Sequence, residues 1–109
     1  MTQVAVVQMT STPSVEHNLS SAQRLVRAAA QASARLVVLP ECFAYRGPDG
    51  GQRDIAEALP QGGPILAECQ RWARELEVEL VLGGFWERAD DSQKVHNACV
   101  HLGSDGTVK

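Results

Sequence analysis

Two short runs of apolar, mostly β-branched residues frame a segment with helical periodicity, and this order constrains the fold more than any other feature. The runs are 4–9 (VAVVQM) and 36–39 (LVVL), and each has the length of a β-strand. Neither run alternates between apolar and polar residues, so both predict strands that are buried on both faces of a sheet. Pro40 ends the second run, because proline cannot donate to a strand ladder.

The segment between the runs predicts an amphipathic helix. Its apolar residues recur at steps of three and four, which places them on one face, and Thr12 or Ser14 can cap its start. A second helix is predicted from Pro64 to Leu76, with Arg71 and Glu75 spaced as an i,i+4 pair on its polar face. The apolar positions of the two helices are Val15, Leu19, Ala22, Val26 and Ala29, followed by Ile65, Cys69, Trp72, Ala73 and Leu76.

The remaining segments complete a β-α-β-α-β-β order. Residues 78–82 and 95–102 predict two further strands, with a polar turn at 87–93 between them. The long connection from 47 to 63 holds five of the nine glycines and a short helix predicted at 54–59. Strands separated by helices favour a parallel sheet with right-handed crossovers. We therefore predict an α/β fold with an antiparallel pair at its end.

The length of the chain is that of a whole domain, but the predicted sheet has one face that the chain cannot cover. A chain of 109 residues has the size of one domain. If both crossovers run the same way, both helices lie on one face of the sheet, and no remaining segment can cover the other face. We therefore expect a partner subunit or a C-terminal continuation to cover it.

Composition argues against several classes of partner and location. The net charge is -3, with 10 basic and 13 acidic residues, so the basic surface that binds nucleic acid or anionic membranes is missing. The three cysteines show no CxxC spacing, which argues against a disulfide framework or a zinc site. The N-terminus does not have the pattern of a secretory signal, and no run of 18 apolar residues occurs. We expect a cytoplasmic location.

Glu41 directly follows the second predicted strand, in the string LPECF at 39–43. Ligands bind α/β sheets beyond the carboxyl ends of the strands, and a carboxylate in a partly apolar mouth can act as a general base. The alternative is a solvated turn residue, which is common after strands. Cys42 comes next, but neighbouring side chains after a strand point in different directions, so a structural thiol is the favoured interpretation.

Other residues of types that often bind metals, phosphates or substrates do not form a recognisable site in the sequence. His96 and His101 are five residues apart on one predicted strand and point to opposite faces, which argues against a shared metal. Gly83 and Gly84 match no phosphate-binding loop and instead predict the close approach of a ligand or another backbone. Arg46 lies in a predicted loop, where it either meets a substrate carboxylate or stays solvated.

Five segments of the chain carry a resemblance to a known family. They are VAVVQM at 4–9, Asn18-Leu19, LVVLPECF at 36–43, VELVLGGFWER at 78–88 and HNACVHLGSDG at 96–106. In this order and spacing they resemble the N-terminal part of the carbon-nitrogen hydrolase family, also called the nitrilase superfamily, and its small amidase branch most. The resemblance implies an α-β-β-α sandwich, of which residues 1–109 would be the N-terminal part with the C-terminal half absent.

The resemblance also implies an activity, which is hydrolysis of non-peptide carbon–nitrogen bonds in a small-molecule amide or nitrile. Family members use a Glu-Lys-Cys triad and a thioester intermediate, without a metal or other cofactor. The triad Glu matches Glu41, which would be the general base. The triad Lys lies in a Tyr-x-Lys-x-His string, and the Cys lies further on, in a Cys-Tyr-Asp-x-Arg string. Neither string is present, so Lys109 and Cys42 are not assigned these roles.

Several expectations follow from this match for the chain as a whole. By itself it would carry only the Glu of the triad and would be inactive. The family's assembly into longer stacks implies a homo-oligomer. The alternative hypothesis is a non-catalytic α/β binding or interaction module. A flavodoxin-like module is disfavoured because no anion-binding loop follows the first predicted strand.

Overall fold

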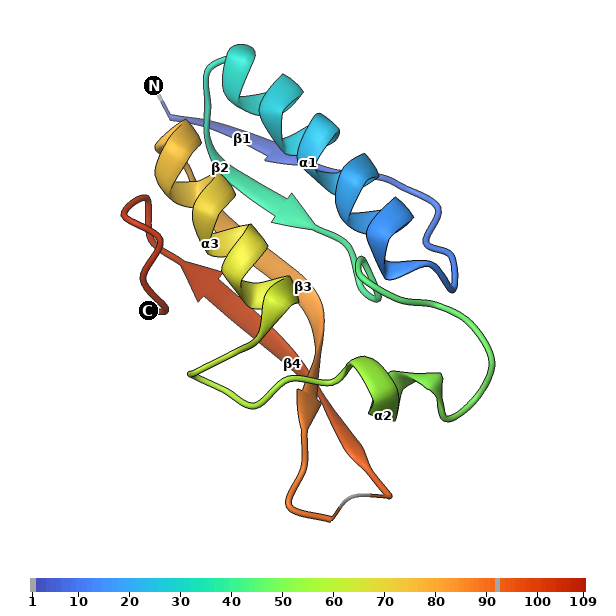
Figure 1. Ribbon diagram of the computed structural model, residues 1–109. Coiled ribbons are helices and arrows are strands. Elements are labelled where there is room, and N and C mark those ends of the chain that lie inside the picture. The colour runs from blue at the N-terminus through green and yellow to red at the C-terminus, as the bar shows by residue number, and fades with distance from the viewer. Residues whose placement is uncertain (1, 92) are drawn as a thin grey trace.

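The described residues, 2–91 and 93–109 of the computed structural model, contain the predicted alternation of strands and helices. The strands are β1 (Gln3–Val6), β2 (Ala34–Leu39), β3 (Glu79–Arg88) and β4 (Val95–Leu102), and the helices are α1 (Val15–Gln31), α2 (Gly51–Ile55) and α3 (Pro64–Leu76). The sheet has the order β1-β2-β3-β4 (Figure 1). The β1-β2 and β2-β3 pairs are parallel and the β3-β4 pair is antiparallel, which confirms the predicted α/β topology.

The helices α1 and α3 lie side by side on the same face of the sheet (Figure 1). The Oγ of Ser14 accepts a hydrogen bond from the amide of His17 at 3.1 Å, so Ser14 is the cap of α1. The predicted apolar face of each helix packs against the core, with Val26 of α1 and Trp72 of α3 fully or almost fully buried. Within the described residues, no helix combines the length and apolar character needed to cross a membrane.

In the part of the chain that the structure describes, helices cover one face of the sheet, as predicted from the direction of the two crossovers (Figure 1). The inward-facing side chains of the three longer strands are buried in the core. They are Val37, Leu39, Leu80, Leu82, Val100 and Leu102. On β1, by contrast, Val4 is 57% exposed and Val6 is 79% exposed. The prediction that both runs are buried on both faces is therefore wrong for the described residues, because their helices lie on one face of the sheet, and Leu36 and Val38 of β2 are likewise only half-buried.

The structure also changes the ends of two predicted strands. The first strand ends at Val6 rather than at residue 9, since its last backbone contact with β2 runs from the amide of Val7 to the carbonyl oxygen of Val38 at 2.9 Å. β3 extends to Arg88 instead of ending at residue 82, because pairing with β4 continues as far as Val95. The predicted turn at 87–93 thus begins later, and residue 92 lies outside the described residues.

The short helix α2 ends at Ile55, so the prediction of a helix at 54–59 is wrong. The residues after it pair with the edge of β3 instead. The amide of Glu57 donates to the carbonyl oxygen of Trp86 at 3.1 Å, and the amide of Arg88 donates to the carbonyl oxygen of Glu57 at 2.9 Å. These two backbone bonds require an extended conformation at Glu57, which is incompatible with a helix there.

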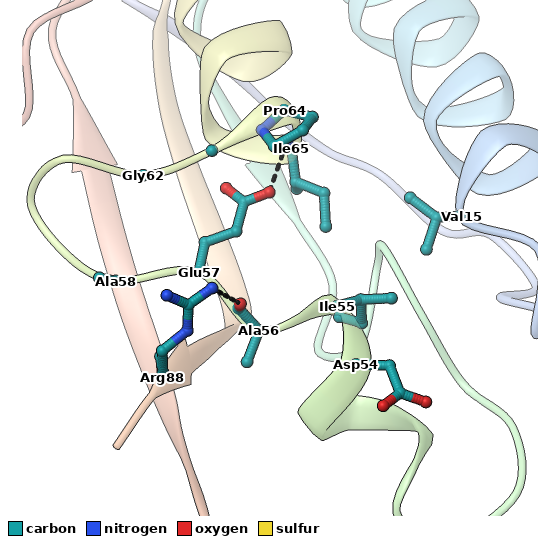
Figure 2. A pocket seen from close by; sticks show the side chains of 11 residues that line it. Val15, Asp54, Ile55, Ala56, Glu57, Ala58, Gly62, Pro64, Ile65 and Arg88 are labelled. Carbon is teal, nitrogen blue, oxygen red and sulfur yellow. Dashed lines mark hydrogen bonds between the residues drawn. The ribbon is translucent and has the colours of Figure 1, made fainter. Parts of the chain in front are cut away.

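The carboxylate of Glu57 caps α3 from outside the helix. Its Oε2 accepts from the amide of Ile65 at 2.7 Å and its Oε1 accepts from the amide of Leu66 at 2.9 Å, while the side chain is only 6% exposed. Figure 2 shows this carboxylate directed at the start of α3, beside a pocket of about 360 Å³. Because Gly63 at the N-cap has no capping side chain, Glu57 satisfies amides that would otherwise have no acceptor.

Replacing Glu57 with Gln will lower the free energy of unfolding by about 2 kcal/mol, because a neutral amide retains one acceptor oxygen and directs its NH₂ group at the helix amides. Urea unfolding followed by circular dichroism measures the change. Glu68→Gln is the control, since Glu68 pairs with Arg71 at the surface and its loss will cost less than about 1 kcal/mol. Equal effects of the two substitutions would contradict the capping role.

Candidate active site

Glu41 lies beyond the carboxyl end of β2, in a turn at the edge where the carboxyl ends of β1 and β2 meet. This is the place that the sequence predicts for it. The turn and the loop after β1 line a hollow of about 340 Å³. The lining residues are Met9, Thr10, Ser11, Glu41 and Arg46. The Glu41 carboxylate is therefore exposed to a concave, mostly polar surface, where a small molecule can reach it.

Asn97 of β4 orients the Glu41 carboxylate. Its Nδ2 donates a hydrogen bond to Oε1 of Glu41 at 3.0 Å. Among the described residues, Oε2 of Glu41 has no hydrogen-bond partner, so this oxygen is free to accept a proton from a ligand or water. Asn97 lies in one of the five resembling segments, but its role could not be predicted from the sequence, because only the pairing of β4 with β3 brings it to Glu41.

Gly83 and Gly84 allow the β2 end to pass close over β3, as predicted. A Cβ on Gly83 would collide with the carbonyl oxygen of Leu39. A Cβ on Gly84 would lie 2.9 Å from both the Cα and the Cγ of Glu41 and 3.0 Å from the amide nitrogen of Cys42. Any side chain at these positions would displace the turn that carries Glu41.

Asn18 of α1 joins the loops that follow β1 and β2. Its Oδ1 accepts from the amide and from the hydroxyl of Thr12, both at 2.9 Å. Its Nδ2 donates to the carbonyl oxygen of Thr12 at 2.7 Å and to that of Ala44 at 2.9 Å. The side chain is fully buried, and its whole hydrogen-bonding capacity is used. Sequence reasoning missed this role, because the partners of a buried Asn cannot be read from spacing.

Cys42 does not have the environment of an activated nucleophile. Its pKa is raised by partial burial and then by the negative charge of Glu41, against the smaller opposing effect of Arg46. The thiol therefore stays protonated at neutral pH, whereas an activated nucleophile needs a lowered pKa. Its backbone has a φ of 58°, a left-handed conformation that turns its side chain away from a regular strand direction.

The other predicted candidates also lie where the sequence places them. Cys69 is fully buried in the core, and burial raises its thiol pKa. His101 contacts Glu79 at 2.8 Å, whereas His96 lies further along β4 opposite Glu87. In the part of the chain that the structure describes, no group of three or more His, Cys, Asp or Glu side chains is arranged to hold a metal ion.

The family model for carbon-nitrogen hydrolases matches residues 3–109. The chain belongs to the carbon-nitrogen hydrolase family. The resemblance of the five sequence segments is thereby confirmed.

Two relatives show how much of the family's length is present. This carbon-nitrogen hydrolase chain is 44% identical to the human deaminated glutathione amidase over 112 residues, which cover 96% of the chain and 33% of the relative. It is 35% identical to an omega-amidase of Xenopus tropicalis over 107 residues, which cover 96% of the chain and 37% of that relative. The chain thus spans about a third of the length of these relatives.

Solved structures of the nitrilase superfamily share the fold. The Caenorhabditis elegans NitFhit protein matches with a TM-score of 0.86 and 28% identity, over 99% of this chain and 27% of that one. Saccharomyces cerevisiae Nit3, a member of the nitrilase superfamily, matches with a TM-score of 0.86 and 24% identity, over 98% of this chain and 41% of that one. The α/β arrangement described above is the arrangement of this superfamily.

Proposed function

We propose that residues 1–109 form the N-terminal part of an amidase-type carbon-nitrogen hydrolase, with Glu41 as its general base. The observation that carries this proposal is the placement of the Glu41 carboxylate at the mouth of the sheet. One oxygen is held by Asn97 and the other is unpaired among the described residues. A carboxylate held in this way can accept and return a proton at a fixed position. Membership of the family supplies the reaction class.

The proposed reaction uses Glu41 in both of its halves. Glu41 takes the proton from a cysteine thiol in the remainder of the protein, and the sulfur attacks the carbonyl carbon of a primary amide. The proton then passes to the leaving nitrogen, and ammonia departs to leave a thioester. In the second half, Glu41 takes a proton from water, the hydroxide attacks the thioester, and the acid and the restored thiol are released. A lysine would stabilise both oxyanions.

The pairing at the end of the chain supports a lysine located beyond Lys109. Val108 forms an antiparallel bridge with Leu102, and the amide of Lys109 donates to the carbonyl oxygen of His101 at 2.8 Å. Residues that continue this register would run along the free edge of β4 toward Asn97, and so toward Glu41. Lys109 itself is paired through Nζ with Glu79 at 3.3 Å, at the opposite end of β3, so it is not the triad lysine.

An assay of ammonia release tests the proposal. The full-length form, meaning this chain continued to the length of its relatives, will release ammonia from primary amides. Because the relatives at 44% and 35% identity are amidases, we expect amides rather than nitriles as substrates. We expect residues 1–109 alone to release none, because a base without a nucleophile has nothing to activate. If the full-length form hydrolyses no member of an amide and nitrile panel, the alternative of a non-catalytic binding module is favoured.

A further inference from the structure

The pocket beside Glu57 lies between the start of α1, the end of α2 and the start of α3, and has a volume of about 360 Å³. Figure 2 shows the apolar side chains of Val15, Ile55 and Ile65 around it, with the carboxylate of Glu57 near them. The pocket shares no lining residue with the hollow at Glu41, so it is a separate cavity. A mostly apolar cavity of this size with a few polar groups can hold a small organic molecule.

The carboxylate of Glu57 lines this pocket and has unused capacity to accept hydrogen bonds. A carboxylate can accept about four hydrogen bonds. Among the described residues, Glu57 accepts only those from the amides of Ile65 and Leu66. The side chain is 6% exposed, so its free lone pairs lie in a largely dry place. A charge-assisted hydrogen bond from a ligand is strong under such conditions.

The charges around the pocket favour a cation as the ligand. Asp54 and Arg88 are the other charged residues that line it, so two carboxylates face one guanidinium. Arg88 is not paired with Glu57, since its Nη2 donates to the carbonyl oxygen of Ala56 at 3.3 Å (Figure 2). Within residues 2–91 and 93–109, no cationic group lies within ion-pair distance of Glu57. The buried carboxylate therefore lacks a cationic partner from this part of the chain.

We propose that this pocket binds a small primary alkylammonium ion, with its ammonium group at Glu57 and its alkyl chain against Val15, Ile55 and Ile65. An ammonium group has three donors, which match the unused lone pairs of the carboxylate. The apolar walls favour an alkyl chain over a bare cation, because burying the chain removes apolar surface from water. The site does not depend on the proposed function of Glu41, because the two cavities share no residue.

Calorimetric titration of the full-length protein with three ligands of equal chain length tests the proposal at neutral pH. Pentylamine, which is then an ammonium ion, will bind saturably with a Kd of about 1 mM. The neutral 1-pentanol will bind at least about tenfold more weakly, because it lacks the charge. Pentanoate will not bind, because Glu57 repels it. The peptide Ala-Lys-Ala will also bind at least about tenfold more weakly than pentylamine, because the far end of the alkyl chain lies against the wall at α1 and leaves no room for a peptide backbone.

Two variants locate the binding site. Glu57→Gln will weaken pentylamine binding at least about tenfold, because it removes the charge. Since that substitution also weakens the cap of α3, the second variant is Val15→Phe, which fills the pocket from α1, leaves Glu57 intact and will abolish binding. Glu68→Gln is the control, since it removes an acid of α3 outside the pocket, and it will leave the Kd within about twofold. Circular dichroism shows that each variant is folded.

Four results would overturn the inference. The first is no saturable binding of pentylamine to the wild type, and the second is an equal affinity for 1-pentanol. The third is an unchanged Kd for pentylamine in the folded Val15→Phe variant. The fourth is tighter binding of Ala-Lys-Ala than of pentylamine, which would assign the pocket to a lysine side chain of a partner protein instead.

Discussion

Replacing Glu41 with Gln will lower kcat for amide hydrolysis by the full-length protein by about 10³-fold. General acid–base groups contribute on this scale, and Glu41 is proposed to move a proton in both halves of the reaction. The substituted amide keeps the size of the side chain, and its oxygen can still accept the hydrogen bond from Asn97. The loss will therefore report on proton transfer and not on altered packing. Steady-state ammonia release, measured at saturating amide, gives the change.

Two comparisons separate this effect from unfolding. Glu16→Gln, which alters an exposed acid in the first turn of α1, will leave kcat within about twofold. The unfolding midpoint in urea will be similar for the wild type, Glu41→Gln and Glu16→Gln, because both altered side chains are exposed. A Glu41→Gln variant that retains more than a tenth of the wild-type kcat would show that another group is the general base.

Replacing Asn18 with Leu will lower the free energy of unfolding by about 3 kcal/mol. The substitution removes four hydrogen bonds and leaves the amide of Thr12 and the carbonyl oxygen of Ala44 without their partner in a partly or fully buried place. Chemical denaturation of the full-length protein measures the change. Ser20→Ala on the exposed face of the same helix will change stability by less than about 0.5 kcal/mol. Equal stabilities of the two variants would show that the hydrogen bonds of Asn18 to the loops after β1 and β2 do not stabilise the fold.

The variant Asn18→Asp adds a pH dependence with a defined sign. The introduced carboxyl group would keep its contacts with Thr12 but direct its second oxygen at the carbonyl oxygens of Thr12 and Ala44. Burial and these oxygens disfavour the ionised form, so the pKa of the new group in the folded state rises above the value of about 3.9 in the unfolded chain. The loss of stability relative to the wild type will thus be smallest below about pH 4 and will grow as the pH rises. A loss of stability that does not depend on pH would show that the carboxyl group at position 18 is neither buried nor close to the carbonyl oxygens of Thr12 and Ala44.

The helix α1 could be predicted from the sequence, whereas the position of the short helix in the loop at 47–63 could not. Apolar residues at helical spacing predicted α1 and α3, because a periodic pattern is a local property that one buried face imposes. The same reasoning misplaced α2, because Glu57 is held extended by backbone bonds to Trp86 and Arg88, which are distant in sequence. Local pattern cannot report on a contact whose partner lies about thirty residues away.

For the candidate site, two features could be predicted from the sequence: the position of Glu41 after a buried strand, and the Gly83-Gly84 pair that leaves space for it. Both follow from rules that act over a few residues, which are strand ends and the absence of a Cβ. The folded structure was needed to show that Asn97 orients the carboxylate, that Asn18 joins the loops after β1 and β2, and that Arg46 lines the same hollow as Glu41. These relations depend on strand pairing and helix packing, which bring side chains together without any regular spacing in the chain.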